Sequence, residues 1–221
     1  MGRPRTISDE DIFAATERTM RRLGPATLTL ANVANEAGIS AATLVQRFGS
    51  KRGLLLAVSK AAAAGGMDAC FDMLRETTPS PLEQLIAAAM FMTQAVETPD
   101  QLANHMGFFL QVDLTDPDFY PHTLEMSRQM DAAYVRLANE AVDAGELIPC
   151  DTTALARAIG AVAGGSLLGW AVYREGTAAD WVRRDIETLI APYRRTSHHG
   201  STRFNTAKSH QGSTRFNTGK S

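Results

Sequence analysis

A group of polar side chains in residues 40–47 is the first feature of the sequence that could do chemistry. Thr43, Gln46 and Arg47 fall on one side of a helix predicted there, away from Leu44. Hydroxyl, amide and guanidinium groups match the hydrogen-bonding edges of bases and the oxygens of phosphates. The group therefore indicates contact with nucleic acid.

A basic pair follows this polar face directly. Ser50 is predicted to begin the next helix, with Lys51 and Arg52 in its first turn. Unpaired backbone N–H groups at a helix N-terminus, together with two cations, favour a bound phosphate. Lys51 is therefore predicted to contact the backbone of DNA.

The residues before these two groups predict a rigid support for them. Thr29 and Ser40 can each cap a short helix through their hydroxyl oxygens. Ala34 is small enough for two helices to cross closely, and Gly38 suits a turn with positive φ. The pattern predicts a helix-turn-helix, and the same spacing also fits a helical corner without a ligand.

Residues 12–55 resemble the DNA-binding domain of the TetR/AcrR family of bacterial repressors. The family pattern is matched at Ile12, Ala15, Gly24, Thr29, Val33, Ala34, Ala37, Gly38, Ile39, Ser40, Thr43, Leu44, Phe48, Ser50, Lys51 and Leu54. Val45 departs from it, because the family usually has a tyrosine there that serves a phosphate. The resemblance implies an N-terminal DNA-binding domain followed by a helical domain that binds an effector and dimerises.

The predicted DNA contacts come from an N-terminal arm and from the helix-turn-helix. They are Arg3, Arg5, Thr29, Ser40, Ala41, Ala42, Thr43, Val45, Gln46, Arg47 and Lys51. The arm, Gly2-Arg3-Pro4-Arg5, is similar to the core of AT-hooks, which lie in narrow minor grooves. A position near phosphates is the alternative for the arm.

Charge is distributed unevenly along the chain, although the net charge is only −2. Residues 1–60 carry nine Lys/Arg and five acids, whereas residues 61–196 carry nine Lys/Arg and 19 acids. Residues 197–221 carry four Lys/Arg and no acid. The basic N-terminal part therefore favours an anionic partner.

The composition argues against several classes of protein. With 44% hydrophobic and 21% charged residues, the chain of 221 residues can bury a core. Cys70 and Cys150 are isolated, which disfavours a disulfide framework or structural zinc and favours a reducing cytoplasm. We expect no signal peptide and no membrane span, because the longest uncharged run, residues 158–173, is short and rich in glycine and alanine.

Proline and glycine divide the chain into helical segments, so the predicted fold class is all-α with about nine helices. The helices are expected near residues 8–23, 29–36, 40–47, 50–76, 81–97, 100–113, 117–144, 151–174 and 178–193. Residues 1–52 are assigned to the DNA-binding domain, residues 53–196 to the effector-binding and dimerisation domain, and residues 197–221 to a disordered tail.

The tail is a tandem repeat of a twelve-residue unit. Residues 197–208 and 209–220 are identical at ten of twelve positions. They are polar and almost without aliphatic side chains, so they cannot bury a core. His198 and His199 could hold a metal loosely, but a flexible tail is the favoured interpretation.

Four glycines lie within the helix predicted over residues 151–174. Gly160, Gly164, Gly165 and Gly169 each cost about 1 kcal/mol in a helix interior relative to alanine, so close helix packing is the expected reason for them. The resemblance implies that the last two helices form a four-helix bundle with those of a second copy, which makes these glycines a predicted dimer interface. Packing inside one chain is the alternative.

Methionine and aromatic side chains crowd the central helices, and the resemblance implies an effector pocket among them. Its predicted lining is Met90, Gln94, His105, Phe108, Phe109, Met126, Met130, Tyr134 and Trp170. Lys and Arg are scarce in this part of the chain. A neutral or cationic lipophilic effector is therefore expected to bind better than an anion.

These features together predict a ligand-responsive transcriptional repressor that binds a palindromic DNA operator as a homodimer. An activator is an alternative of the same class. A small-molecule-binding or protein-interaction protein without operator binding is an alternative from another class. No group of residues suits catalysis, so we expect no enzyme, no cofactor and no metal. The expected partners are double-stranded DNA, a small apolar or amphipathic effector and a second copy, in the cytoplasm and without a membrane.

Overall fold

The computed structural model describes residues 7–195, apart from the side chains of residues 66–70 and 72, and every helix or strand assigned within that range is a helix. The α-helices are α1 (Asp9–Thr27), α2 (Leu30–Ala37), α3 (Ala41–Phe48), α4 (Lys51–Ala61), α5 (Met67–Thr77), α6 (Pro81–Ala89), α7 (Pro99–Phe108), α8 (Tyr120–Asp143), α9 (Thr152–Tyr173) and α10 (Ala178–Ile190). Short π-helical turns are η1 (Ala62–Gly66) and η3 (Phe109–Asp113), and short 3-10 turns are η2 (Phe91–Ala95) and η4 (Ala191–Tyr193). The predicted all-α class is confirmed. The arm with Arg3 and Arg5 and the repeated tail lie outside the described residues.

The head, which we define as α1 to α4, has a hydrophobic core of its own. Ile12, Leu28, Val33, Leu44 and Leu54 are buried in it and come from every part of the head. Burial of each such side chain contributes about 1.5–3 kcal/mol to folding. The core holds α3 with one face inward and leaves its other face to the surface.

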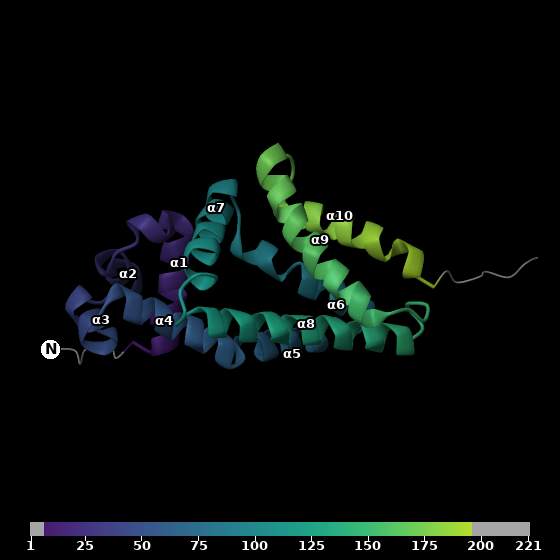
Figure 1. The fold of residues 1–221 in the computed structure, drawn as a ribbon, viewed down its shortest axis with the longest axis horizontal. Helices are drawn as coiled ribbons and strands as arrows, with labels where there is room; N and C mark the ends of the chain where they lie inside the picture. Colours follow the sequence, from purple (N-terminus) through teal and green to yellow (C-terminus); the bar gives the residue numbers. More distant parts are fainter. Residues whose placement is uncertain (1–6, 196–221) are drawn as a thin grey trace, which may run out of the picture.

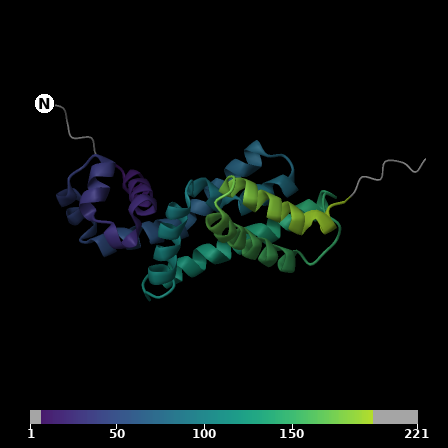
Figure 2. The ribbon, with the colours of Figure 1, turned by 90° about the horizontal axis from the view of Figure 1, so that it is seen from above.

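The body, which we define as α5 to α10, has a second core between α6, α8, α9 and α10. Leu85, Ile86, Leu137, Ile159 and Ile186 are buried in it. In Figure 1, α8 runs along the molecule, and α9 crosses it with α10 alongside. Figure 2 shows the head at one end of the molecule and α10 towards the other.

Several predicted helices are interrupted in the structure. The segment predicted as one helix over residues 50–76 is α4, η1 and α5, with non-helical backbone at Gly65 (φ 151°). The helix predicted over residues 81–97 ends at α6 and continues as η2, and the one over residues 100–113 ends in η3. The described residues therefore contain ten α-helices where nine were expected.

The sequence predicts no segment that could span a membrane, but helix α9 is longer than the uncharged run on which that prediction is based. The uncharged run is only part of this helix of 22 residues, which is long and apolar enough to cross a membrane by length and composition alone, with a mean hydropathy of 1.4. Its inner residues Leu155, Ile159, Leu167 and Trp170 are buried against the rest of the body. An apolar inner face of this kind is also typical of a helix that packs in the core of a protein.

Candidate nucleic-acid interface and ligand cavity

The helix-turn-helix formed by α2 and α3 is held by caps. The Thr29 hydroxyl accepts a hydrogen bond from the Asn32 N–H (3.2 Å), and the Asn32 carboxamide oxygen accepts one from the Thr29 N–H (3.0 Å). Ser40 begins α3 by accepting a hydrogen bond from the Thr43 N–H at 3.1 Å. Between the helices, Gly38 has a left-handed conformation (φ 69°), which glycine adopts without steric cost. These local contacts set the angle between the two helices.

One face of α3 lies against the head core and the other is open. Leu44 is fully buried, whereas Val45 is 49% exposed. The exposed or half-exposed residues on the open side are Ala42, Thr43, Val45 and Gln46, whereas Ala41 packs against the head core. A narrow helix face with one amide and small or apolar neighbours can enter a major groove and touch base edges. The structure thus brings four of the predicted contacts together on this face.

Arg47, by contrast, binds other groups of the head. Its guanidinium pairs with the Asp9 carboxylate (2.5 Å) and donates to the Ile7 carbonyl oxygen (2.9 Å). It therefore ties α3 to the N-terminal end of α1. The predicted base or phosphate contact stays a prediction, and in this structure the side chain is held by groups that lie about 40 residues earlier.

Lys51 also binds groups of the head, at the other end of α1. Its ammonium group donates to the carbonyl oxygens of Pro25 (2.9 Å) and Leu28 (2.8 Å) and is partly buried. A cation at a helix C-terminus satisfies carbonyl groups that have no partner within the helix. Lys51 therefore joins α4 to the end of α1, and the phosphate contact stays a prediction.

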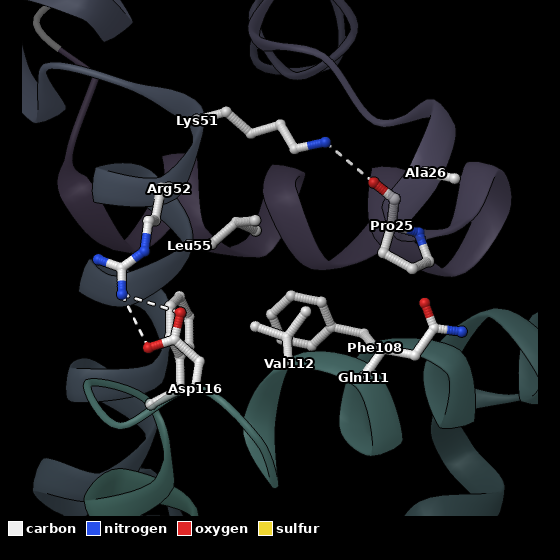
Figure 3. Close-up of a pocket in the computed structure, with 10 residues that line it drawn as sticks. Pro25, Ala26, Lys51, Arg52, Leu55, Phe108, Gln111, Val112 and Asp116 are labelled. Carbon is white, nitrogen blue, oxygen red and sulfur yellow. Dashed lines mark hydrogen bonds and ion pairs between the residues drawn. The ribbon is translucent and has the colours of Figure 1, made fainter.

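Head and body meet at a junction lined by paired charges, which Figure 3 shows in close-up. The Arg52 guanidinium lies 2.8 Å from the Asp116 carboxylate and 2.7 Å from that of Asp118. It also lies over the Phe119 ring, 5.4 Å from its centre. The Asp118 backbone N–H and Arg52 lower the pKa of the Asp116 carboxyl. A cavity of about 380 Å³ lies beside these groups and also contacts Leu55.

A second contact between head and body joins α1 to α7. The Asn104 side-chain amide donates to the Arg21 carbonyl oxygen (2.9 Å), and its side-chain oxygen lies 2.5 Å from the position that a Cβ atom on Gly24 would take. His105 lies beside it, and burial, followed by the charge of Arg21, lowers the pKa of its imidazole. The predicted effector residue His105 thus lies in this junction.

The body contains a further cavity of about 370 Å³ between the end of α6, η2, α8 and α9. Its lining is Ala88, Ala89, Phe91, Met92, Met126, Ser127, Met130, Asp131, Tyr134, Gly160, Ala163, Gly164 and Leu167. Met126, Met130 and Tyr134 are predicted effector residues, and the structure brings these three together. The other ten lining residues are not among the predicted effector residues.

The remaining predicted effector residues lie elsewhere. Phe108 packs against the head core, and Phe109 follows it in the turn η3. Met90 packs on the body core, and Gln94 is exposed on η2. Trp170 is buried, and its indole N–H donates to the Gly176 carbonyl oxygen (3.2 Å). None of these six, counting His105, lines the body cavity.

The four glycines of α9 divide into two kinds. A Cβ atom on Gly169 would lie 3.2 Å from the Trp181 ring, and one on Gly160 would lie 3.8 Å from the Tyr134 ring. Their small size is thus explained within one chain. Gly164 and Gly165 have no atom within 4 Å of such a Cβ position. Gly160 and Gly164 line the body cavity, which the sequence did not indicate.

An apolar face of α9 is open to solvent. Leu168 is 52% exposed and Val172 is 77% exposed, and Gly165 and Ala161 are exposed one and two turns before Leu168. The spacing of three or four residues puts all four on one side of the helix. This face is distinct from the buried face that packs on α8 and α10.

Within the described residues, no group of three His, Cys, Asp or Glu side chains is arranged to hold a metal ion, and Cys150 is a free thiol. A capped helix-turn-helix on a larger helical body defines a class of bacterial transcription factors. Residues 12–58 match the family model described as bacterial regulatory proteins, tetR family. Residues 12–58, most of the head, are therefore a DNA-binding domain of the TetR type, the module of bacterial transcriptional regulators.

Solved structures with the same fold span nearly the whole chain at low identity. A TetR transcription regulator from Haloarcula marismortui is 19% identical, with 85% of this chain and 98% of that chain covered and a TM-score of 0.62. A transcriptional regulator from Saccharomonospora viridis in complex with choline is 17% identical, with 83% and 95% covered and a TM-score of 0.65. The regulator FadR from Bacillus subtilis, in complex with stearoyl-CoA, is 14% identical, with 83% and 98% covered and a TM-score of 0.60. A comparison with curated proteins gave no match.

Proposed function

We propose that this regulator is a repressor that binds a palindromic operator as a homodimer and releases it when a small effector occupies the body. The observation that carries the proposal is the open face of α3. Its inner face is fixed by Leu44 and its ends by the caps, so Val45 and Gln46 are held outward on a rigid support. Rigid presentation of a few side chains is what reading of base edges requires.

On this proposal, the DNA contacts are made by groups that the head leaves free. Gln46 reads a base edge, most favourably an adenine, and Val45 packs against a thymine methyl group. Thr29, Ser40, Ala41, Ala42 and Thr43 line the approach to the groove. Arg47 and Lys51 support the interface from behind instead of touching DNA.

The dimer uses the exposed face of α9 together with α10. Leu168 and Val172 expose apolar surface that a second copy would cover. A two-fold axis through this face makes the same patch meet itself, as in most homodimers. Two heads related by that axis would reach two half-sites of an inverted repeat.

The effector occupies the body cavity, whose volume falls within the range of small-molecule sites. Complexes of two similarly folded regulators with choline and stearoyl-CoA support a ligand role for the body. The effector favours a state of the dimer in which the two heads no longer match the operator, and the site of action is the cytoplasm. By linkage, an effector that weakens DNA binding is itself bound less tightly by the DNA complex, by the same factor.

A gel-shift titration of DNA from upstream of the chain's own gene tests the proposal. The wild-type protein is expected to bind one fragment tightly, and Gln46→Ala is expected to change the preference among single-base variants by about 1–3 kcal/mol. Gln111→Ala is the matched control, because this exposed glutamine lies in the body. Absence of any specific complex would favour the alternative of a ligand-binding protein without an operator, which the internal pairing of Arg47 and Lys51 also fits.

A further inference from the structure

The body cavity has a mixed wall of flexible and aromatic apolar groups. Met126 and Met130 come from α8, Phe91 comes from η2, and Leu167 comes from α9. Methionine adapts its shape to different ligands, and aromatic rings attract cations to their faces. The wall therefore accepts a lipophilic group of irregular shape.

The charged side chains that line this cavity are all of negative sign. No Lys or Arg lines it, and Asp131 contributes its only carboxylate. Asp131 is exposed at the cavity, and no ion pair joins it to any side chain that the structure describes, residues 66–70 and 72 being outside that set. Tyr134, the other ionisable lining group, stays neutral near pH 7, because burial and the charge of Asp131 raise its pKa to about 12.

Small residues of α9 form one wall of the cavity and leave space in it. Gly160, Ala163 and Gly164 follow one another at helical spacing and face the side of α8 that carries Tyr134. Nothing lies within 4 Å of a Cβ position on Gly164. A larger side chain at this position would use the space that a ligand needs.

We propose that the body cavity binds a small lipophilic cation, with its apolar part against the methionines and Phe91 and its positive charge beside Asp131. The proposal rests on the ligand-responsive role of the body and names the ligand class for it. A carboxylate or phosphate ligand would meet the Asp131 charge with no cation in the lining to offset it.

Calorimetric titration of the full-length protein with three octyl compounds tests the charge preference. Octyltrimethylammonium, octanol and octanoate share a chain and differ in charge. The cation is expected to bind tightest and octanoate weakest. Asp131→Asn is expected to weaken the cation about fivefold and leave octanol unchanged, since a partly exposed charge pair contributes modestly. Asp143→Asn, at an exposed carboxylate near the end of the same helix, is the matched control and is expected to change neither.

A second variant tests the location. Gly164→Leu is expected to abolish binding of the cation while the thermal unfolding transition stays cooperative. Unchanged cation affinity in both Asp131→Asn and Gly164→Leu, or tighter binding of octanoate than of the cation, would overturn the proposal.

Gel shifts run in parallel separate this inference from the proposed function. A cation that binds the cavity but leaves the DNA complex intact would contradict the effector mechanism and keep the ligand class. Release of DNA by octanoate, with no response to the cation, would keep the mechanism and contradict the ligand class.

Discussion

Lys51 is a basic residue whose charge stabilises the head. Two backbone carbonyl oxygens at the end of α1 accept its hydrogen bonds, and the ammonium group is partly buried. Loss of a charged donor leaves both carbonyls without that partner. The residue therefore links α1 and α4 across a sequence separation of more than 20 residues.

Substitution of Lys51 by Met is expected to lower the free energy of unfolding by about 1–3 kcal/mol, since the stem remains and the donor is lost. Urea denaturation followed by circular dichroism measures the change. Lys60→Met, at an exposed lysine on the same helix, should stay within about 0.5 kcal/mol of wild type. Equal effects of the two variants would contradict the capping role.

Asp113, in η3, carries a carboxyl that the fold does not stabilise in its charged form. One of its oxygens is buried without a hydrogen-bond partner within the described part of the chain. Burial raises its pKa from 3.8 to about 6. The folded state therefore binds more protons than the unfolded state between these values, so the stability contribution is largest below about pH 4 and is lost as pH rises through 6.

Asp113→Asn is expected to stabilise the protein at pH 7.5 by on the order of 1 kcal/mol, an amount reduced for partial exposure, and to have little effect at pH 4. Denaturant unfolding at the two pH values measures the difference. A larger gain for Asp113→Asn at pH 4 than at pH 7.5 would reverse the sign argued here.

Among the elements, those fixed by local contacts could be predicted closely from the sequence. The helices predicted over residues 29–36 and 40–47 lie within one residue of α2 and α3, because Thr29 and Ser40 cap them through bonds three residues away. The break at η1 was missed, since the surrounding alanines favour a continuous helix.

Elements of the site that depend on distant partners could not be predicted in this way. The spacing of Arg47 and Lys51 put both on a DNA-facing surface, but Asp9 and the end of α1 hold them. The open face around Val45 and Gln46 followed from Leu44 alone, because burial of one side of a helix exposes the other. The cavity needed three segments from far apart in the chain, so the sequence found only its α8 wall.

The packing of α1 on α7 depends on Gly24. This buried residue has φ 75° and ψ 168°, and a Cβ atom there would lie 2.5 Å from the Asn104 side-chain oxygen. Gly24→Ala is expected to cost several kcal/mol, from backbone strain of about 1–3 kcal/mol and from the clash. Gly38→Ala, with positive φ but open space, is expected to cost only about 1–2 kcal/mol.

A double-mutant cycle separates the two contributions at Gly24. If the clash matters, Gly24→Ala should cost less in an Asn104→Ala background than in the wild-type protein. Chemical denaturation of the four proteins measures the coupling. A coupling energy near zero would assign the whole cost to the backbone.

On the scale of the whole molecule, the dimer proposed above places the two-fold contact at the open face of α9. Leu168→Arg is expected to convert the dimer to monomers and to weaken operator binding, because a charge would be buried at the two-fold contact. Light scattering coupled to gel filtration measures the mass. Met73→Arg is the matched control, because this methionine on α5 is 65% exposed and lies away from α9. An unchanged mass for Leu168→Arg would move the interface elsewhere.

Phe119 has a consequence for how such regulators can be recombined. It follows the junction loop of the body, yet it is 1% exposed and belongs to the head core, where it contacts the region of Phe108 and Arg52. A chimera joined between residues 52 and 58 would carry the DNA-binding helices without Phe119, and a cavity would replace its ring in the head core. Transfer of the head between relatives therefore requires that the segment between α7 and α8 is transferred with the N-terminal helices. The part of the chain that must be exchanged is thus discontinuous in the sequence.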